Sequence, residues 1–141
     1  MKVLIVDDEP DILLMLRVNL EAAGFQTALA ADGETALRRI SDDAPEVVLL
    51  DVMMPVMDGW GVLQSLSATP AGPKVIVVSA KSSDRDVVRA LELGAWEYVT
   101  KPFDPDDLVA IVRRVLSSTP DELEAHRRET IAQCGGTFGA A

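Results

Sequence analysis

Cysteine and long apolar runs are nearly absent from this sequence. Its 141 residues hold a single cysteine, Cys134, which excludes an intramolecular disulfide and is typical of a reducing compartment such as the cytoplasm. No apolar run approaches the roughly 20 residues that a membrane-spanning helix needs, and "MKVLIV" is too short for a signal peptide. We therefore expect a cytoplasmic protein that does not enter a membrane.

Positive charge is also scarce. The 13 lysines and arginines are outnumbered by 23 aspartates and glutamates, which gives a formal net charge of −10 at pH 7. A surface with this balance repels the phosphates of nucleic acids and the headgroups of anionic lipids. We therefore expect no direct binding to nucleic acid or membranes, and a cation or a basic protein surface as the preferred partner.

Apolar runs of strand length are present instead. The runs at residues 3–6, 47–50 and 75–78 are apolar throughout and rich in β-branched residues. Such runs are typical of strands that are covered on both faces, as in a parallel sheet. The weaker runs "FQTALA" and "WEYV" predict two further strands nearer the sheet edges.

Helical apolar spacing separates these runs. Pro10 and Pro105 stand where the first turn of a helix accepts proline, and Gly24 and Gly94 stand where helices end. Five strand–helix repeats within about 117 residues predict the α/β class, with a doubly wound sheet of five parallel strands and helices on both faces.

A change in composition after Ser118 marks the predicted end of this domain. We assign residues 1–118 to one domain and residues 119–141 to an extension. The extension begins with "TPDELEAHRRETIAQ", which predicts a polar helix, and ends with "CGGTFGAA", which predicts a flexible tail. The only histidine, His126, lies there. We expect no catalytic role for His126.

Polar residues follow four of the predicted strands. Asp7 and Asp8 close the first strand, Asp51 the third and Ser79 the fourth, and Lys101 follows the fifth. The carboxyl ends of parallel strands meet at one edge of a sheet, where open α/β folds bind ligands in a crevice. We expect these five side chains to converge there.

The chemistry of this set is specific. Three carboxylates in one crevice repel one another unless a cation neutralises them, and Mg²⁺ takes oxygen ligands while it keeps several waters. A lysine ammonium and a serine hydroxyl are suitable partners for phosphoryl oxygens. The pattern predicts a Mg²⁺ site that receives a phosphoryl group.

Four motifs, "VDDEP", "LLDVMMPVMDGW", "VIVVSAK" and "YVTKPF", resemble the receiver domain of bacterial two-component response regulators. The resemblance covers roughly residues 2–117 and implies the flavodoxin-like strand order 2-1-3-4-5. It also implies phosphoryl transfer from a histidine kinase, which switches a protein-interaction surface. Because "LELGAWEYVTKPF" is most similar to receivers of winged-helix transcription factors, we expect the receiver part of a transcriptional regulator or a stand-alone receiver.

The resemblance assigns roles to the acidic residues. Asp51 matches the phosphoacceptor. Asp8, Asp51 and the backbone carbonyl of Met53 are expected to ligate Mg²⁺ directly, and Asp7 through a water. Lys101 is expected to pair with Asp51 and then with a phosphoryl oxygen.

Other positions are assigned in the same way. Ser79 matches the switch hydroxyl and Tyr98 the aromatic switch residue, and the Lys101–Pro102 peptide is expected to be cis. Glu9 is no motif position, and we expect its charge to favour a helix N-terminus.

Backbone shape and packing explain a further group. Pro55, Asp58 and Gly59 are expected to form the turn after Asp51. Trp60 is expected to pack on its helix, and the exposure of Trp96 is left open.

A homodimer through the fourth helix, fifth strand and fifth helix is the second partnership that the resemblance implies. The charged residues available for cross-pairs there are Arg89, Glu92, Glu97, Arg113 and Arg114.

Two other functions are compatible with such a fold. A Mg²⁺-dependent phosphatase with an aspartyl nucleophile needs an Asp-x-Asp pattern after the first strand and a cap domain, whereas this strand ends in "DDE". A flavin carrier needs a Ser/Thr/Gly-rich loop there, and an absorbance spectrum would identify it. We expect that the protein is a signalling module and not an enzyme, and that it catalyses only its own phosphorylation and dephosphorylation.

Overall fold

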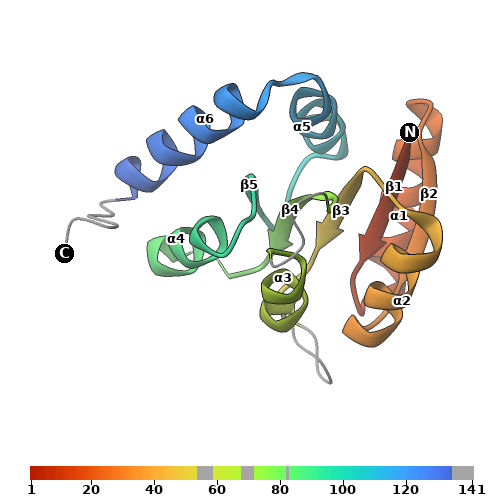
Figure 1. Cartoon of the computed structure of the whole chain (residues 1–141). Coiled ribbons are helices and arrows are strands. Elements are labelled where there is room, and N and C mark those ends of the chain that lie inside the picture. The colour runs from red at the N-terminus through yellow and green to blue at the C-terminus, as the bar shows by residue number, and fades with distance from the viewer. Residues whose placement is uncertain (54–58, 68–71, 82, 135–141) are drawn as a thin grey trace.

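The computed structural model describes residues 1–53, 59–67, 72–81 and 83–134, which form a central sheet flanked by helices (Figure 1). The strands are β1 (Lys2–Val6), β2 (Gln26–Ala30), β3 (Val47–Leu50), β4 (Lys74–Ser79) and β5 (Glu97–Thr100). The helices are α1 (Pro10–Ala22), α2 (Gly33–Asp43), α3 (Gly59–Ser67), α4 (Asp84–Glu92), α5 (Pro105–Ser117) and α6 (Pro120–Gln133). The helices in the described part of the chain are too short or too polar to cross a bilayer.

All strand pairs in the sheet are parallel, and the order is β2-β1-β3-β4-β5. This confirms the predicted α/β class and strand order. Val6 pairs with Leu50 at the carboxyl ends of β1 and β3, and the Asp51 amide continues the ladder by donating to the Val6 carbonyl at 3.0 Å. Asp7 and Asp51 therefore leave the sheet side by side.

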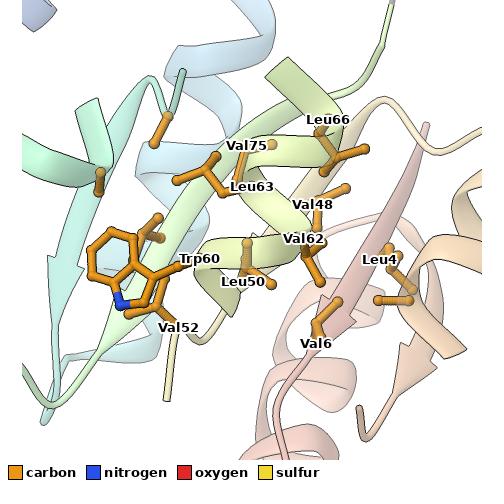
Figure 2. Close-up of a cluster of buried hydrophobic side chains, with 14 of the residues drawn as sticks. Leu4, Val6, Val48, Leu50, Val52, Trp60, Val62, Leu63, Leu66 and Val75 are labelled. Atoms are coloured by element: carbon orange, nitrogen blue, oxygen red, sulfur yellow. The ribbon is translucent and has the colours of Figure 1, made fainter. Parts of the chain in front are cut away.

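The strands bury apolar residues on both faces because their side chains alternate. Along β3, Val48 and Leu50 join the cluster covered by α2, α3 and α4, which Figure 2 shows around Trp60. Val47 and Leu49 join the cluster covered by α1 and α5. Helices on both faces are thus confirmed, and Trp60, which is 7% exposed, packs in the core as expected.

The helix boundaries follow the residues that punctuate the sequence. Pro10 and Pro105 open α1 and α5, where a missing amide hydrogen has no effect on helix bonding. Gly24 and Gly94 follow α1 and α4 with φ of 97° and 116°, a region that favours glycine. The positions expected from sequence are confirmed.

Helix α6 packs against the rest of the molecule. Leu123 and Ile131 are 1% and 3% exposed, and each belongs to a different one of the two core clusters. Residues 135–141, the predicted tail, lie outside the described residues, as do Pro55 and Asp58 of the predicted turn.

Candidate functional site

Four carboxylates gather at the carboxyl edge of the sheet. One oxygen each from Asp7, Asp8, Glu9 and Asp51 lies within 4.8 Å of the others. The first three come from the turn between β1 and α1, and Asp51 comes directly after β3. A set of hard, anionic oxygen donors fits Mg²⁺ better than a transition metal that prefers nitrogen or sulfur.

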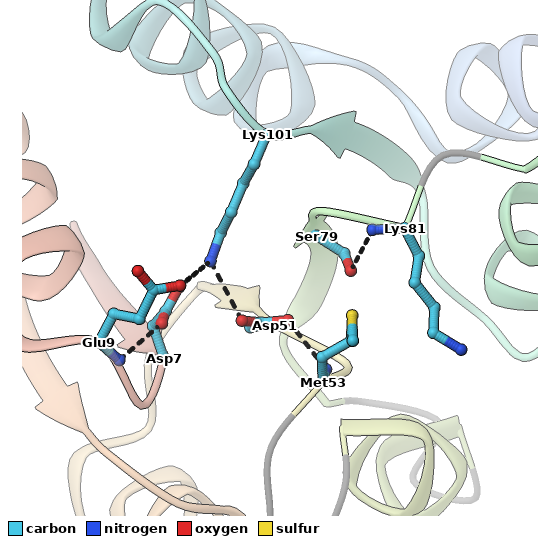
Figure 3. A network of polar contacts seen from close by, with 7 residues as sticks. All are labelled: Asp7, Glu9, Asp51, Met53, Ser79, Lys81 and Lys101. Carbon is cyan, nitrogen blue, oxygen red and sulfur yellow. Dashed lines mark hydrogen bonds and ion pairs between the residues drawn. The ribbon is translucent and has the colours of Figure 1, made fainter.

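Lys101 reaches three of these carboxylates (Figure 3). Its Nζ donates to Asp7 Oδ2 at 2.6 Å and to Asp51 Oδ2 at 3.1 Å, and it lies 3.5 Å from Glu9 Oε1. Its backbone amide donates to the Ser79 carbonyl at 2.8 Å, and its peptide bond to Pro102 is cis. The structure thus brings Lys101 to Asp51, with two further carboxylates within reach.

Asp51 is almost completely buried, with 4% of its surface exposed. Burial raises the pKa of its carboxyl group, the charge of Asp7 acts in the same direction, and the Met53 amide and Lys101 only partly offset them. For Lys101, burial lowers the pKa, but its bonds to Asp7 and Asp51 outweigh burial and raise it. The two directions agree physically, because one ammonium is shared among several carboxylates and the site keeps excess negative charge.

Asp7 and Asp8 differ in how far they are engaged. Asp7 is 2% exposed, and its two oxygens accept from the Glu9 amide at 2.9 Å and from Lys101. Asp8 is exposed, and its carboxylate makes no hydrogen bond or ion pair with the residues that the structure describes. Asp8 is therefore the more available oxygen donor for a cation, in agreement with its expected direct ligation.

Glu9 lies at the helix N-terminus as expected, and it also belongs to the site. It is the N-cap residue of α1; its side chain makes no capping hydrogen bond and turns toward Lys101 and the acidic cluster. Its charge therefore acts near the helix terminus and near the site. The adjacent position in "DDEP" was the available signal, because the tight turn after β1 brings all three acids to one edge.

The backbone around Asp51 is tightly packed. The Met53 amide donates to Asp51 Oδ1 at 2.9 Å, a contact that sequence reasoning missed, whereas the direction of the Met53 carbonyl stays a prediction. A Cβ on Gly59 would lie 2.3 Å from the Asp51 carbonyl oxygen and 2.3 Å from Val52 Cα. Only glycine fits at the start of α3 without moving the backbone of Asp51 and Val52, which supports the role in backbone shape expected for Gly59.

The two expected switch residues meet at Lys81. Ser79 is fully buried, and its Oγ accepts from the Lys81 amide at 3.2 Å (Figure 3). The Tyr98 hydroxyl donates to the Lys81 carbonyl at 2.7 Å, and burial raises its pKa. The segment after β4 therefore connects the strand beside Asp51 with β5.

Comparison with protein families and known sequences gives a consistent result. The sequence model described as the response regulator receiver domain matches residues 3–113. The alkaline phosphatase synthesis transcriptional regulatory protein PhoP of Bacillus subtilis is 40% identical over 115 residues, which are 82% of this chain and 48% of that protein. The transcriptional regulatory protein KdpE of Mycobacterium tuberculosis is 43% identical over 130 residues, 91% of this chain and 57% of that protein. The chain spans about half the length of the curated relatives it matches.

Solved structures of receiver domains are also similar. The BeF3-activated N-terminal receiver domain of Klebsiella pneumoniae RstA gives a TM-score of 0.79 at 27% identity and covers 84% of this chain and 100% of that chain. The BeF3-activated DrrB receiver domain gives 0.76 at 35% identity and covers 83% and 97%. The fold and the sequence point to the same family.

Proposed function

Because this chain belongs to the response regulator receiver domain family, we propose that a histidine kinase transfers a phosphoryl group to Asp51 in a Mg²⁺-dependent reaction. The observation that carries the proposal is the buried Asp51 carboxylate, which is bonded to Lys101 beside three further acids. The receiver is a signalling module, and the transfer serves to switch its surface.

The acceptor step follows from the chemistry of Asp51. A carboxylate oxygen attacks the phosphorus of a phosphohistidine on the kinase, an O–P bond forms, and the N–P bond breaks. The electron pair of that bond returns to the imidazole, which takes up a proton. Burial withdraws water from the Asp51 carboxylate, as its raised pKa indicates, and so favours attack by the anion.

The other residues act by charge and position. Asp8, Asp51 and the Met53 carbonyl are the proposed ligands of Mg²⁺, with Asp7 acting through a water; a bound ion would neutralise the phosphoryl oxygens and the carboxylates. Lys101 exchanges its bond to Asp51 for one to a phosphoryl oxygen and keeps its bond to Asp7. Ser79, at the end of the neighbouring strand β4, supplies a hydroxyl donor to another phosphoryl oxygen. Tyr98 moves together with Ser79, because both are hydrogen-bonded to the backbone of Lys81.

The proposal extends to the organisation of the protein. We take residues 1–118 as the receiver and residues 119–141 as its extension, in a transcriptional regulator or a stand-alone receiver. The similarity to PhoP and KdpE supports the first alternative. The kinase and the use of ATP-derived phosphoryl groups imply a cytoplasmic location. A homodimer through α4, β5 and α5 is the proposed phosphorylated form.

Phosphorylation can be tested directly. The protein is incubated with Mg²⁺ and acetyl phosphate, and the adduct is mapped by mass spectrometry after reduction of the acyl phosphate. We expect modification of Asp51 alone, and none in Asp51→Asn or without Mg²⁺. Asp32→Asn is the matched control, because Asp32 caps α2 and is not part of the acidic cluster, and asparagine also caps helices. A modification that persists in Asp51→Asn contradicts the assignment.

A further inference from the structure

Helix α6 lies along the surface formed by α4, β5 and α5 (Figure 1), which we call the α4–β5–α5 face. β5 is an edge strand, because it pairs with β4 alone among the described strands. α6 follows α5 after a connection of two residues, Ser118 and Thr119, and contacts α4. The same face is the one proposed for the homodimer.

Two apolar residues hold α6 on this face. Leu123 belongs to the cluster that includes Leu108 and Val112 of α5. Ile131 belongs to the cluster that includes Ala90 and Leu91 of α4. Because residues eight positions apart lie on one side of a helix, α6 bridges the two cores around the open edge of the sheet.

Polar contacts of α6 concentrate on four consecutive residues, 94–97. The Arg127 guanidinium donates to the carbonyls of Gly94 and Ala95, each at 3.2 Å, and stacks over Trp96 at 3.6 Å from the ring centroid. His126 Nε2 lies 2.8 Å from Glu97 Oε2, and the same carboxylate pairs with Arg114 of α5. The exposure of Trp96 is thereby settled: the ring is half-buried and Arg127 covers it.

Most charged groups proposed for the dimer already have partners within one chain, and α6 holds one of them, Glu97. Glu97 and Arg114 pair with each other and with His126 within one chain. Arg113 donates to the Ala23 carbonyl, and Arg89 stacks over Trp60 at 4.1 Å. Of the charged residues expected to cross-pair, only Glu92 makes no hydrogen bond, ion pair or ring contact with the described part of the chain. Symmetric pairing through this face requires these residues to change partners.

The attachment of α6 is limited, which makes it displaceable. Most of its surface is polar, and Leu123 and Ile131 are its buried residues. A helix of 14 residues with so few buried apolar side chains opens at lower free energy than the core of a domain. Its far end is close to α4: the Cys134 thiol lies beside the Asp84 carboxylate, and burial together with that charge raises its pKa.

A physical connection joins α6 to the acceptor site. Tyr98 follows directly after the 94–97 segment, and its hydroxyl is bonded to Lys81, whose amide donates to Ser79. In the proposed function Ser79 and Tyr98 move toward the phosphoryl group, and this movement would shift the adjoining segment 94–97, to which Arg127 and His126 are attached. Phosphorylation of Asp51 would then weaken the contacts of α6.

We propose that α6 is a displaceable cover of the α4–β5–α5 face, and that a second copy of this chain binds the face only after α6 has left. A second copy suits the face because its arginines and glutamates are interspersed, so that a two-fold arrangement places opposite charges together. The link to phosphorylation rests on the function proposed for Asp51, whereas the cover itself rests on the contacts of α6.

The first test measures hydrogen–deuterium exchange of residues 120–133 with and without Mg²⁺ and beryllofluoride, together with sedimentation velocity. We expect at least about tenfold faster amide exchange in α6 with the activator, in parallel with a dimer. The adduct on Asp51 is verified separately, by slower exchange of the backbone amides around Asp51 when beryllofluoride is present. If no adduct forms, the proposed function fails; if the adduct forms and α6 exchange is unchanged, the present inference is wrong.

The second test needs no phosphorylation. Arg127→Gln removes the contacts to Gly94, Ala95 and Trp96, whereas Arg128→Gln is a matched control, because Arg128 is exposed and pairs only with Glu124 among the described residues. We expect Arg127→Gln to increase α6 exchange about tenfold and to increase the dimer fraction without activator, with Arg128→Gln unchanged. Equal behaviour of the two variants overturns the proposal.

A disulfide can hold the end of α6 against α4. Asp84→Cys places a second thiol beside Cys134, and oxidation joins the end of α6 to the start of α4. The oxidised protein is expected to bind beryllofluoride and to remain monomeric, and reduction is expected to restore dimerisation. Dimerisation of the oxidised protein to the same extent as the reduced one contradicts the role of α6.

Discussion

Lys101 is the counter-charge of a crowded group of acids. Its ammonium bonds Asp7 and Asp51 and lies near Glu9, and only 11% of its side chain is exposed. Without the ammonium, buried carboxylates face one another without compensation, and removal of one partner of a buried ion pair is strongly destabilising. A divalent cation bound at this acidic cluster would perform the same electrostatic task as the lysine.

This equivalence predicts a rescue by metal. We expect Lys101→Met to lose about 2 kcal/mol of stability in EDTA. We also expect Mg²⁺ to stabilise this variant more than it stabilises the unmodified protein. Thermal unfolding in both buffers measures the difference, with Lys81→Met as the control, because the Lys81 side chain is exposed and extends away from Asp51 in Figure 3. An equal response of Lys101→Met and the unmodified protein to Mg²⁺ would show that the two charges act independently.

The unequal engagement of Asp7 and Asp8 makes a second prediction. Asp8→Asn should weaken Mg²⁺ binding more than Asp7→Asn, because Asp7 already uses both oxygens within the protein. A direct carboxylate ligand contributes more to affinity than one that acts through water, and we expect about a tenfold difference in the dissociation constant. Isothermal titration with Mg²⁺ measures both variants. A greater loss in Asp7→Asn would reverse the assignment of the two acids.

At this scale the sequence predicted which residues meet and missed how some of them are bonded. Asp7, Asp51 and Lys101 were placed together because strand ends converge, which depends only on topology. Glu9 turns toward the site, and the Met53 amide donates to Asp51, because of the local backbone angles. Such angles are decided by packing around the loop and leave no periodic signal in the sequence.

Among the elements, α3 has the most constrained beginning. Gly59 starts it against the backbone of Asp51 and Val52, and its amide donates to the Val52 carbonyl at 3.2 Å. The opposing atoms belong to the backbone and cannot rotate away as a side chain can.

Gly59→Ala therefore tests the fit of this helix start. We expect a loss of about 2 kcal/mol from overpacking, which exceeds the gain in helix propensity, and a slower phosphorylation of Asp51. Ser65→Ala, an exposed position of the same helix, should change stability by less than about 0.5 kcal/mol. Urea unfolding of both variants decides the matter, and a stability of Gly59→Ala equal to that of Ser65→Ala would show that the loop yields easily.

The elements differ in how well their sequence revealed them. The buried strands were evident from continuous β-branched runs, and Gly24 and Gly94 marked helix ends. The polar composition of residues 120–133 predicted a helix but not its docking, because two apolar residues eight positions apart give a weak pattern. The contacts of Arg127 with Gly94 and Ala95 join distant segments, and no local pattern encodes them.

For the whole molecule, the two apolar clusters share the same strands. Leu49 and Leu50 are neighbours in β3, yet their side chains enter opposite clusters. Loss of packing on one face therefore loosens the strand that supports the other face. We infer that the receiver unfolds as one unit.

Trp60 provides a probe of this coupling, because it lies in the cluster opposite to Leu49. In a Trp96→Phe background, Leu49→Ala should cost about 2 to 5 kcal/mol and shift the urea midpoint seen by Trp60 fluorescence as far as that seen by circular dichroism. Leu50→Ala, on the face of Trp60, is the matched comparison. A Trp60 transition that stays in place while the dichroism shifts would reveal two separate units.

The rate at which the Cys134 thiol is alkylated depends on whether α6 is docked. The thiolate is the species that attacks maleimides and disulfides, and burial beside Asp84 disfavours it. When the end of α6 separates from α4, the thiol enters water and loses that neighbour, so its alkylation accelerates. As the only cysteine of the chain, Cys134 needs no removal of competing thiols, and a simple colorimetric time course reads the position of a helix.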